Sequence, residues 1–196
     1  DIYLGYSSPK TPSRVYLYNL KNKSKKLVKE QEIPSGHDPD DYIVERIEYK
    51  SHDGRLVPLT ITRHKKTKLD GSANLLLYGY GSYGNSMSPS FSSTRLSLIN
   101  RDIIWATAHI RGGMEKGMKW WKEGKLTNKK NTFEDYIFAA KYLINEKYSS
   151  KGKIIGMGGS AGGLLMGAVV NQAPELFLGI IMAVPFVDSL TTNLDH

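Results

Sequence analysis

The chain has 196 residues, of which 40% are hydrophobic and 23% charged, a balance typical of a globular protein with one ordinary domain. It has no cysteine, which excludes disulfides, thiolate metal sites and cysteine nucleophiles and fits a cytoplasmic location. The net charge of +8 comes from lysine-rich polar segments between apolar runs, a pattern typical of solvated loops. No apolar run approaches the ~18 residues that span a bilayer. We therefore expect no contact with nucleic acid or membrane.

The first part of the chain differs from the rest in its pattern of expected secondary structure. Residues 1–33 contain short strand-like segments separated by the turn-like sequences PKTPS and KNKS. The segment 32–41 is rich in Pro, Gly and Asp, as connectors are. We expect a first unit over residues 1–33 and a second over 34–196. Because the chain begins at Asp1 and not at Met, we also expect it to be trimmed or a piece of a longer protein.

A hairpin is expected at the start of the second unit. The strand-like segments 42–50 and 56–64 flank Asp53-Gly54, a pair suited to the positive φ angles of tight hairpin turns. After Gly71, short runs that are apolar throughout alternate with helical stretches, as in strands buried on both faces of a parallel sheet. The expected strands are 75–79, 103–109, 153–158 and 179–186. The expected helices are 133–147, 161–171 and a weaker one over 94–100.

The helix over 133–147 follows the i, i+3, i+4, i+7 spacing of apolar residues. We expect Thr132 to cap its N-terminus, with Asp135 completing a box-like pair. Alternation of strand and helix predicts an α/β fold with a parallel sheet and right-handed crossovers.

The sequence Gly158-Gly159-Ser160-Ala161-Gly162 fits the pattern G-x-S-x-G between a buried strand and an apolar helix. In a nucleophile elbow, a serine in this context lies on a strained strand-to-helix turn, and glycines two positions either side avoid collisions with backbone. The Ala161 N–H at the helix N-terminus can then receive a developing oxyanion. The alternatives are a glycine-rich packing turn or a phosphate loop that lacks the usual G-K-[ST] ending.

Several segments together resemble the prolyl oligopeptidase family, and within it the oligopeptidase B branch. They are YGYGSYG (78–84), HIRGG (109–113), NKKNTFEDY (128–136), GGSAGGLLMG (158–167) and VPFVDSLTTNLD (184–195). The resemblance implies an α/β-hydrolase domain, incomplete at its C-terminal side and preceded by the last strands of a β-propeller. It also implies Ser160 as nucleophile, Tyr80 as the oxyanion hydroxyl and short peptides cut after Arg or Lys as substrates, with no metal or other cofactor. Met114 departs from the family, which has a small residue there.

The acid and base of the triad are missing from the expected places. In this fold the order is Ser, then Asp or Glu, then His, and the only histidine after Ser160 is His196. We expect a complementary C-terminal polypeptide to carry the missing Asp and His, and the isolated chain to be inactive. The alternatives are an esterase-like hydrolase using Asp188 and His196, or a degenerate, non-catalytic product. We interpret His109 as a core or loop-supporting residue.

Overall fold

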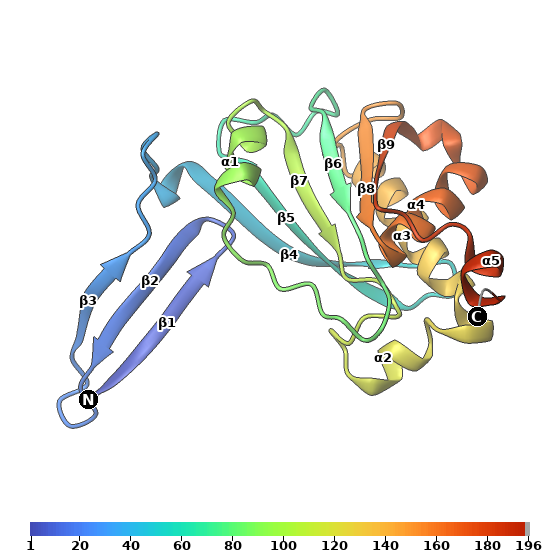
Figure 1. Cartoon of the computed structure of the whole chain (residues 1–196). Coiled ribbons are helices and arrows are strands. Elements are labelled where there is room, and N and C mark those ends of the chain that lie inside the picture. The colour runs from blue at the N-terminus through green and yellow to red at the C-terminus, as the bar shows by residue number, and fades with distance from the viewer. Residues whose placement is uncertain (195–196) are drawn as a thin grey trace.

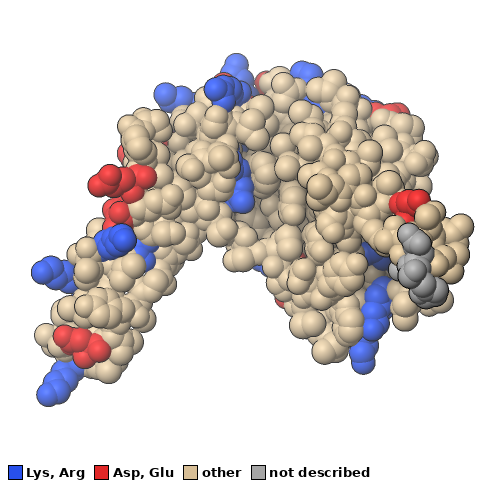
Figure 2. Space-filling view, viewed as in Figure 1, with Lys and Arg blue, Asp and Glu red and all other residues tan. Residues whose placement is uncertain are grey.

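The computed structural model describes residues 1–194 and contains two β-sheets (Figure 1). The smaller sheet is antiparallel and has the strand order β1-β2-β3, with β1 at Ile2–Ser8, β2 at Thr11–Tyr18 and β3 at Lys25–Glu30. It projects from the rest of the molecule as an arm, and Figure 2 shows open space between the arm and the body. Tyr3 and Tyr6 on this arm are 71% and 51% exposed, so the arm buries little of its apolar surface.

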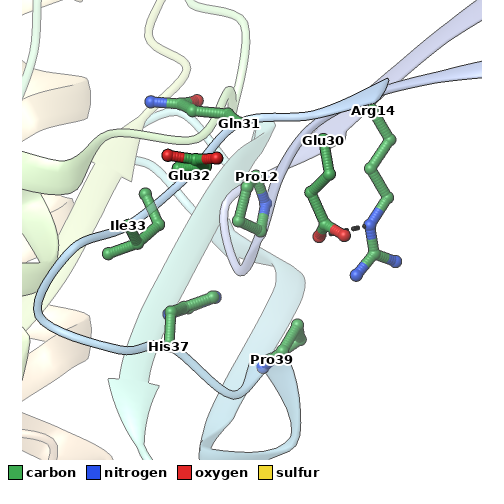
Figure 3. Close-up of a pocket in the computed structure, with 8 residues that line it drawn as sticks. All are labelled: Pro12, Arg14, Glu30, Gln31, Glu32, Ile33, His37 and Pro39. Atoms are coloured by element: carbon green, nitrogen blue, oxygen red, sulfur yellow. Dashed lines mark hydrogen bonds and ion pairs between the residues drawn. The ribbon is translucent and has the colours of Figure 1, made fainter. Parts of the chain in front are cut away.

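A connector joins the arm to the larger sheet. His37 Nε2 donates a hydrogen bond to the Lys10 carbonyl at 2.7 Å, and its ring stacks on Tyr42 with 5.0 Å between centroids. Figure 3 shows the hollow beside this connector, where Arg14 donates a hydrogen bond to Glu30 across neighbouring strands. The connector is thus tied to both sheets, and its one short 3-10 helix, η1, covers Pro39–Asp41.

The larger sheet has six strands in the order β4-β5-β7-β6-β8-β9. The strands are β4 (Tyr42–Lys50), β5 (Leu56–His64), β6 (Leu75–Tyr78), β7 (Ile104–Ala108), β8 (Ile154–Gly159) and β9 (Phe177–Ala183). The last four are parallel to one another, as the apolar runs predict. The expected burial of all four on both faces is wrong for β9, which lies at the sheet edge and is mostly exposed. The hairpin of β4 and β5 is also confirmed, and it joins the parallel strands through antiparallel pairing of β5 with β7. Its turn is longer than two residues, and only Gly54 takes a positive φ, of +79°.

Helices cover both faces of the larger sheet. They are α1 (Ser93–Ile99), α2 (Met118–Lys122), α3 (Lys130–Asn145), α4 (Ala161–Gln172) and α5 (Ser189–Leu194), with the 3-10 turns η2 (Leu126–Asn128) and η3 (Pro174–Leu176). Helices α3 and α4 pack on one face, where Leu77, Tyr136 and Leu165 belong to the main core. Helix α1 lies on the other face, against Tyr42. No helix in residues 1–194 is long and apolar enough to cross a membrane.

Two details of the predicted elements are wrong. Helix α3 begins at Lys130, so Thr132 lies inside it and does not cap it. The Thr132 hydroxyl instead donates to the carbonyls of Arg111 and Gly124, and Asp135 pairs with Arg111. Strand β9 ends at Ala183 and not at residue 186, because Val184 adopts φ +42° before a proline.

Candidate active site

Ser160 lies between the end of β8 and the start of α4, at the carboxyl edge of the parallel strands. Its backbone has φ +55° and ψ −117°, a conformation that a residue with a side chain rarely adopts. Its N–H donates to the Ala183 carbonyl at 2.9 Å, and its carbonyl accepts from the Phe186 N–H at 3.0 Å. These bonds from the neighbouring strand end hold the strained turn, and Ser160 is exposed.

The flanking glycines allow the turn to close. A Cβ at Gly158 would lie 2.2 Å from the Gly162 carbonyl oxygen. A Cβ at Gly162 would lie 3.0 Å from the Gly79 carbonyl oxygen and 3.3 Å from Cδ2 of Tyr80. Any side chain at position 158 would therefore collide with backbone, as is expected at this position of an elbow. At Gly162 the contact is tight and brings the Tyr80 segment directly against the elbow.

The two expected oxyanion donors lie on neighbouring strand ends. Ala161 is the first residue of α4, where the N–H has no partner within the helix, and it is buried. Tyr80 follows β6, which is the direct neighbour of β8 in the sheet, and the Gly79 N–H donates to the Met157 carbonyl at 3.1 Å. Because parallel strands end at the same edge, both residues are placed at the mouth of the elbow.

A hollow of about 650 Å³ opens beside the elbow. It is lined mainly by apolar and aromatic side chains, with two lysines and no carboxylate among its lining residues. The lining consists of Ser82, Tyr83, Gly112, Trp121, Gly124, Lys125, Leu126, Lys129, Ala161, Leu164 and Phe186. Such a concave, mostly apolar site is suited to a side chain of a bound ligand.

A buried ion-pair network lies behind this hollow. The Arg111 side chain is 1% exposed and donates to Asp135 from Nε at 2.9 Å and from Nη2 at 2.6 Å. Its Nη1 donates to Asp53 at 2.6 Å. Ser51 also donates to Asp135, at 2.5 Å. The network joins the β4–β5 turn, the segment after β7 and helix α3, and it was not predicted from the sequence, where no local pattern marks it.

His109 supports the same region from the other side of the segment after β7. Its side chain is buried, with Nε2 at 2.8 Å from the Thr60 hydroxyl and 3.2 Å from Arg46 Nη1. Since arginine can only donate, Nε2 accepts, and Nδ1 lies 3.5 Å from Glu115 Oε1 without a hydrogen bond between them. Burial alone would raise the pKa of Glu115, but the neighbouring His109 ring and the hydrogen bond from the Met87 N–H lower it. This confirms the interpretation of His109 as a loop-supporting core residue.

No histidine in residues 1–194 forms a hydrogen bond with the Ser160 hydroxyl. Asp188 is exposed, and its carboxylate accepts from the Thr191 N–H at 3.1 Å, in the manner of a helix cap. His196, its expected partner in the esterase-like alternative, lies outside the described residues. Within the described part of the chain, no three His, Asp or Glu side chains are grouped to hold a metal ion.

Met114 occupies the position where the sequence departs from the family pattern. Its terminal methyl carbon lies 2.8 Å from the place of a Cβ at Gly84, so the side chain packs on the loop that carries Tyr80. The Gly84 N–H in turn donates to the Gly112 carbonyl at 2.9 Å. The larger residue is therefore accommodated by a glycine on the facing loop.

Comparison with known proteins gives consistent results. The family model described as "Prolyl oligopeptidase family" matches residues 89–196. Dipeptidyl aminopeptidase BI of Pseudoxanthomonas mexicana is 48% identical over 97% of the chain, and Protease 2 of Moraxella lacunata is 42% identical over 100% of it. The structure of oligopeptidase B from Leishmania major superposes with a TM-score of 0.91 at 42% identity over 98% of the chain. The chain spans 26%, 28% and 27% of these three proteins, about a quarter of their length.

Proposed function

The chain belongs to the prolyl oligopeptidase family of serine peptidases, and from this premise we propose that Ser160 is the nucleophile of a peptidase active site. The observation that carries the proposal is the strained backbone of Ser160 at a strand end, closed by Gly158 and Gly162. An elbow of this kind presents a hydroxyl at the edge of the sheet, next to the first N–H of a helix. We assign the oxyanion site to the Ala161 N–H and the Tyr80 hydroxyl.

The proposed reaction proceeds through an acyl-enzyme. The Ser160 oxygen attacks the carbonyl carbon of a peptide bond while a base takes its proton, and the carbonyl oxygen becomes an oxyanion held by Ala161 and Tyr80. The bond to the amine then breaks, and the protonated base gives its proton to the leaving nitrogen. Water hydrolyses the ester and releases Ser160. Every step except the oxyanion contacts depends on the base.

We propose that the base and its acid come from a complementary C-terminal polypeptide that carries an Asp and a His. Two observations support this: no described histidine bonds to Ser160, and the relatives are about four times as long as this chain. A serine hydroxyl without a base is almost fully protonated at neutral pH, so we expect the isolated chain to be inactive. A residual rate of ~10³ over water from the oxyanion donors would be hard to detect on an amide.

We propose that the substrates are short peptides cut after Arg or Lys. The support is similarity to oligopeptidase B from Leishmania major and to Protease 2. The hollow beside Ala161 has no carboxylate among its lining residues, so the acids that would hold a basic side chain are assigned to the complementary polypeptide or to the rest of the propeller-like domain. The chain is also similar to prolyl endopeptidases, such as that of Dictyostelium discoideum at 38% identity. Hydrolysis of substrates ending in Arg or Lys is therefore to be compared with hydrolysis of substrates ending in Pro.

We further propose that residues 1–33 are the end of a β-propeller-like domain and that 34–196 are the N-terminal part of the catalytic domain. The three antiparallel strands of the arm, with exposed apolar side chains such as Tyr3, are what a propeller blade would supply to neighbouring strands. We propose a cytoplasmic location, with which the absence of cysteine is compatible.

The test measures hydrolysis of fluorogenic peptides ending in Arg, Lys or Pro. The chain is assayed alone and after mixing with the segment of Protease 2 that follows the matched 195 residues. We expect activity only in the mixture, preference for Arg and Lys, and complete loss in Ser160→Ala but not in the control Ser93→Ala, an exposed serine on α1. Robust cleavage by the chain alone that Ser160→Ala abolishes would contradict the missing base and direct the search to Asp188 and His196.

A further inference from the structure

Lys129 occupies a place that is electrostatically unfavourable for a lysine. It is the N-cap residue of the 16-residue helix α3, where the helix dipole opposes a positive charge. Its side chain is partly buried in the wall of the hollow beside the elbow. Among residues 1–194 no carboxylate lies within ion-pair distance of its ammonium group. Neither helix stability nor an ion pair therefore explains this cation.

The ammonium group is instead directed at the loop that carries Tyr80. Lys129 Nζ donates to the Gly81 carbonyl at 2.6 Å and to the Ser82 hydroxyl at 2.8 Å. These are the two residues that directly follow Tyr80 in the chain. The Gly81 carbonyl also lies against Gly112, where a Cβ would be 2.0 Å from the oxygen. The loop is thus held on one side by packing and on the other by a charge-assisted pair of hydrogen bonds.

We propose that Lys129 is a positioning residue, which fixes the 79–84 loop so that the Tyr80 hydroxyl is held for the oxyanion. The proposal rests on the proposed function, because it assigns Lys129 to the support of that site. A donor contributes to the transition state only if it is already in place when charge develops. The loop has glycines at 79, 81 and 84, and a flexible loop of this kind needs an external contact to keep one conformation.

The surroundings of Lys129 agree with this role. Burial lowers the pKa of Lys129 to about 8, so keeping its ammonium group charged at neutral pH costs free energy. This charge strengthens both hydrogen bonds. The other titratable groups lining the same hollow are Lys125 and Tyr83, and neither is a carboxylate. Lys125 is engaged with the Trp121 ring, 3.6 Å from its centroid. Lys129 is therefore the cation that contacts the loop.

The first measurement uses the 196-residue chain itself and requires no activity. Amide hydrogen exchange is followed by mass spectrometry in Lys129→Met and in the control Lys130→Met, which removes the same charge from the next, exposed residue of α3. We expect exchange in the peptide over 79–84 to be at least tenfold faster in Lys129→Met and unchanged in Lys130→Met. Equal exchange in the two variants would overturn the proposal.

The second measurement is a double-mutant cycle with Tyr80→Phe in the reconstituted enzyme. Removing one oxyanion donor typically lowers kcat by about 10²–10³-fold, so we expect Tyr80→Phe to fall in this range and Lys129→Met to lose about tenfold or more, with KM within twofold. Because Lys129 acts through Tyr80, the double variant should be within about threefold of Tyr80→Phe alone. Losses that multiply would assign Lys129 to general stability and refute the proposal.

A third variant covers the case in which Lys129→Met unfolds. Lys129→Ala leaves room beside the open hollow, and added propylamine should restore kcat and slow exchange over 79–84, whereas a fold that has collapsed gains nothing from the amine. Failure of rescue in a folded variant counts against the proposal. If Ser160→Ala remains active, the proposed function fails instead, and the exchange data still decide whether Lys129 holds the loop.

Discussion

Replacement of Arg111 by methionine measures how much the buried network behind the site contributes to stability. Methionine keeps most of the aliphatic volume, so the change mainly removes the guanidinium. Asp135, which is fully buried, is then left without its cation and keeps only the hydrogen bonds from the Ser51 hydroxyl and the residue 111 N–H. Asp53, whose side chain is 35% exposed, can return to water.

The expected loss follows from this difference in burial. Removing one partner of a buried pair leaves an uncompensated charge and costs about 3–5 kcal/mol. The exposed side of the network, at Asp53, adds no more than about 1 kcal/mol. We therefore expect the free energy of unfolding to fall by about 3–5 kcal/mol in Arg111→Met. With a urea m-value of ~2 kcal/mol/M, the midpoint should fall by about 1.5–2.5 M.

The assay is urea unfolding of the chain, followed by circular dichroism. Arg55→Met is the matched control, because Arg55 pairs with Glu123 at 2.9 Å but is 48% exposed, and it should cost less than ~1 kcal/mol. Replacing both partners, in Arg111→Met with Asp135→Leu, should recover part of the loss since no buried charge remains unpaired. A loss below about 1 kcal/mol in Arg111→Met, or a double variant that is simply additive, would refute this reasoning.

Three further predictions concern the elbow, the sheet edge and acid stability. Gly158→Ala should lower the activity of the reconstituted enzyme by more than ~100-fold because the new Cβ would collide with backbone. The control Gly179→Ala should not, because no atom lies within 4 Å of the new Cβ. Similar activities of the two variants would contradict the packing proposed for the elbow. The isolated chain should self-associate through β9, where Leu178 and Ile181 are 60% and 43% exposed. Replacing both residues by lysine should shift the sedimentation coefficient toward that of a monomer. A wild-type chain that is monomeric and unfolds in a cooperative transition at high temperature would argue against this. Burial opposes ionisation of Asp53, but hydrogen bonds from the buried guanidinium lower its pKa overall. The contribution of Asp53 to the free energy of unfolding should therefore be complete above about pH 5 and be lost on acidification below ~4. An Asp53→Asn variant with the same acid sensitivity in urea unfolding would exclude this contribution.

The parallel strands and the elbow could be predicted because their signals are local. Four apolar runs mark the four parallel strands, although β9 at the sheet edge is largely exposed, and the glycines around Ser160 reflect the close approach of residues only four positions apart. The end of β9 could not be read in the same way. The run through VPFV is apolar, but the chain turns at Val184 so that Pro185 packs on Gly163 and the Phe186 N–H reaches the Ser160 carbonyl.

Features that depend on distant partners were not predictable from local patterns. Thr132 and Asp135 have side chains suited to a helix cap, yet contacts with Arg111 satisfy both inside the helix. The sequence separations of Arg111 from Asp135 and Asp53 are 24 and 58 residues, and that of Lys129 from Gly81 is 48. Each of these contacts becomes visible only when the sheet brings the segments together.

Covalent trapping of Ser160 tests the central claim most directly. A fluorophosphonate reacts with a serine that an active site has activated, and peptide mapping by mass spectrometry identifies the modified residue. We expect fast labelling confined to Ser160 when the chain is mixed with the complementary polypeptide, slow labelling of the chain alone, and none in Ser160→Ala. Labelling at another serine, or an equal rate with and without the complementary polypeptide, would contradict the account.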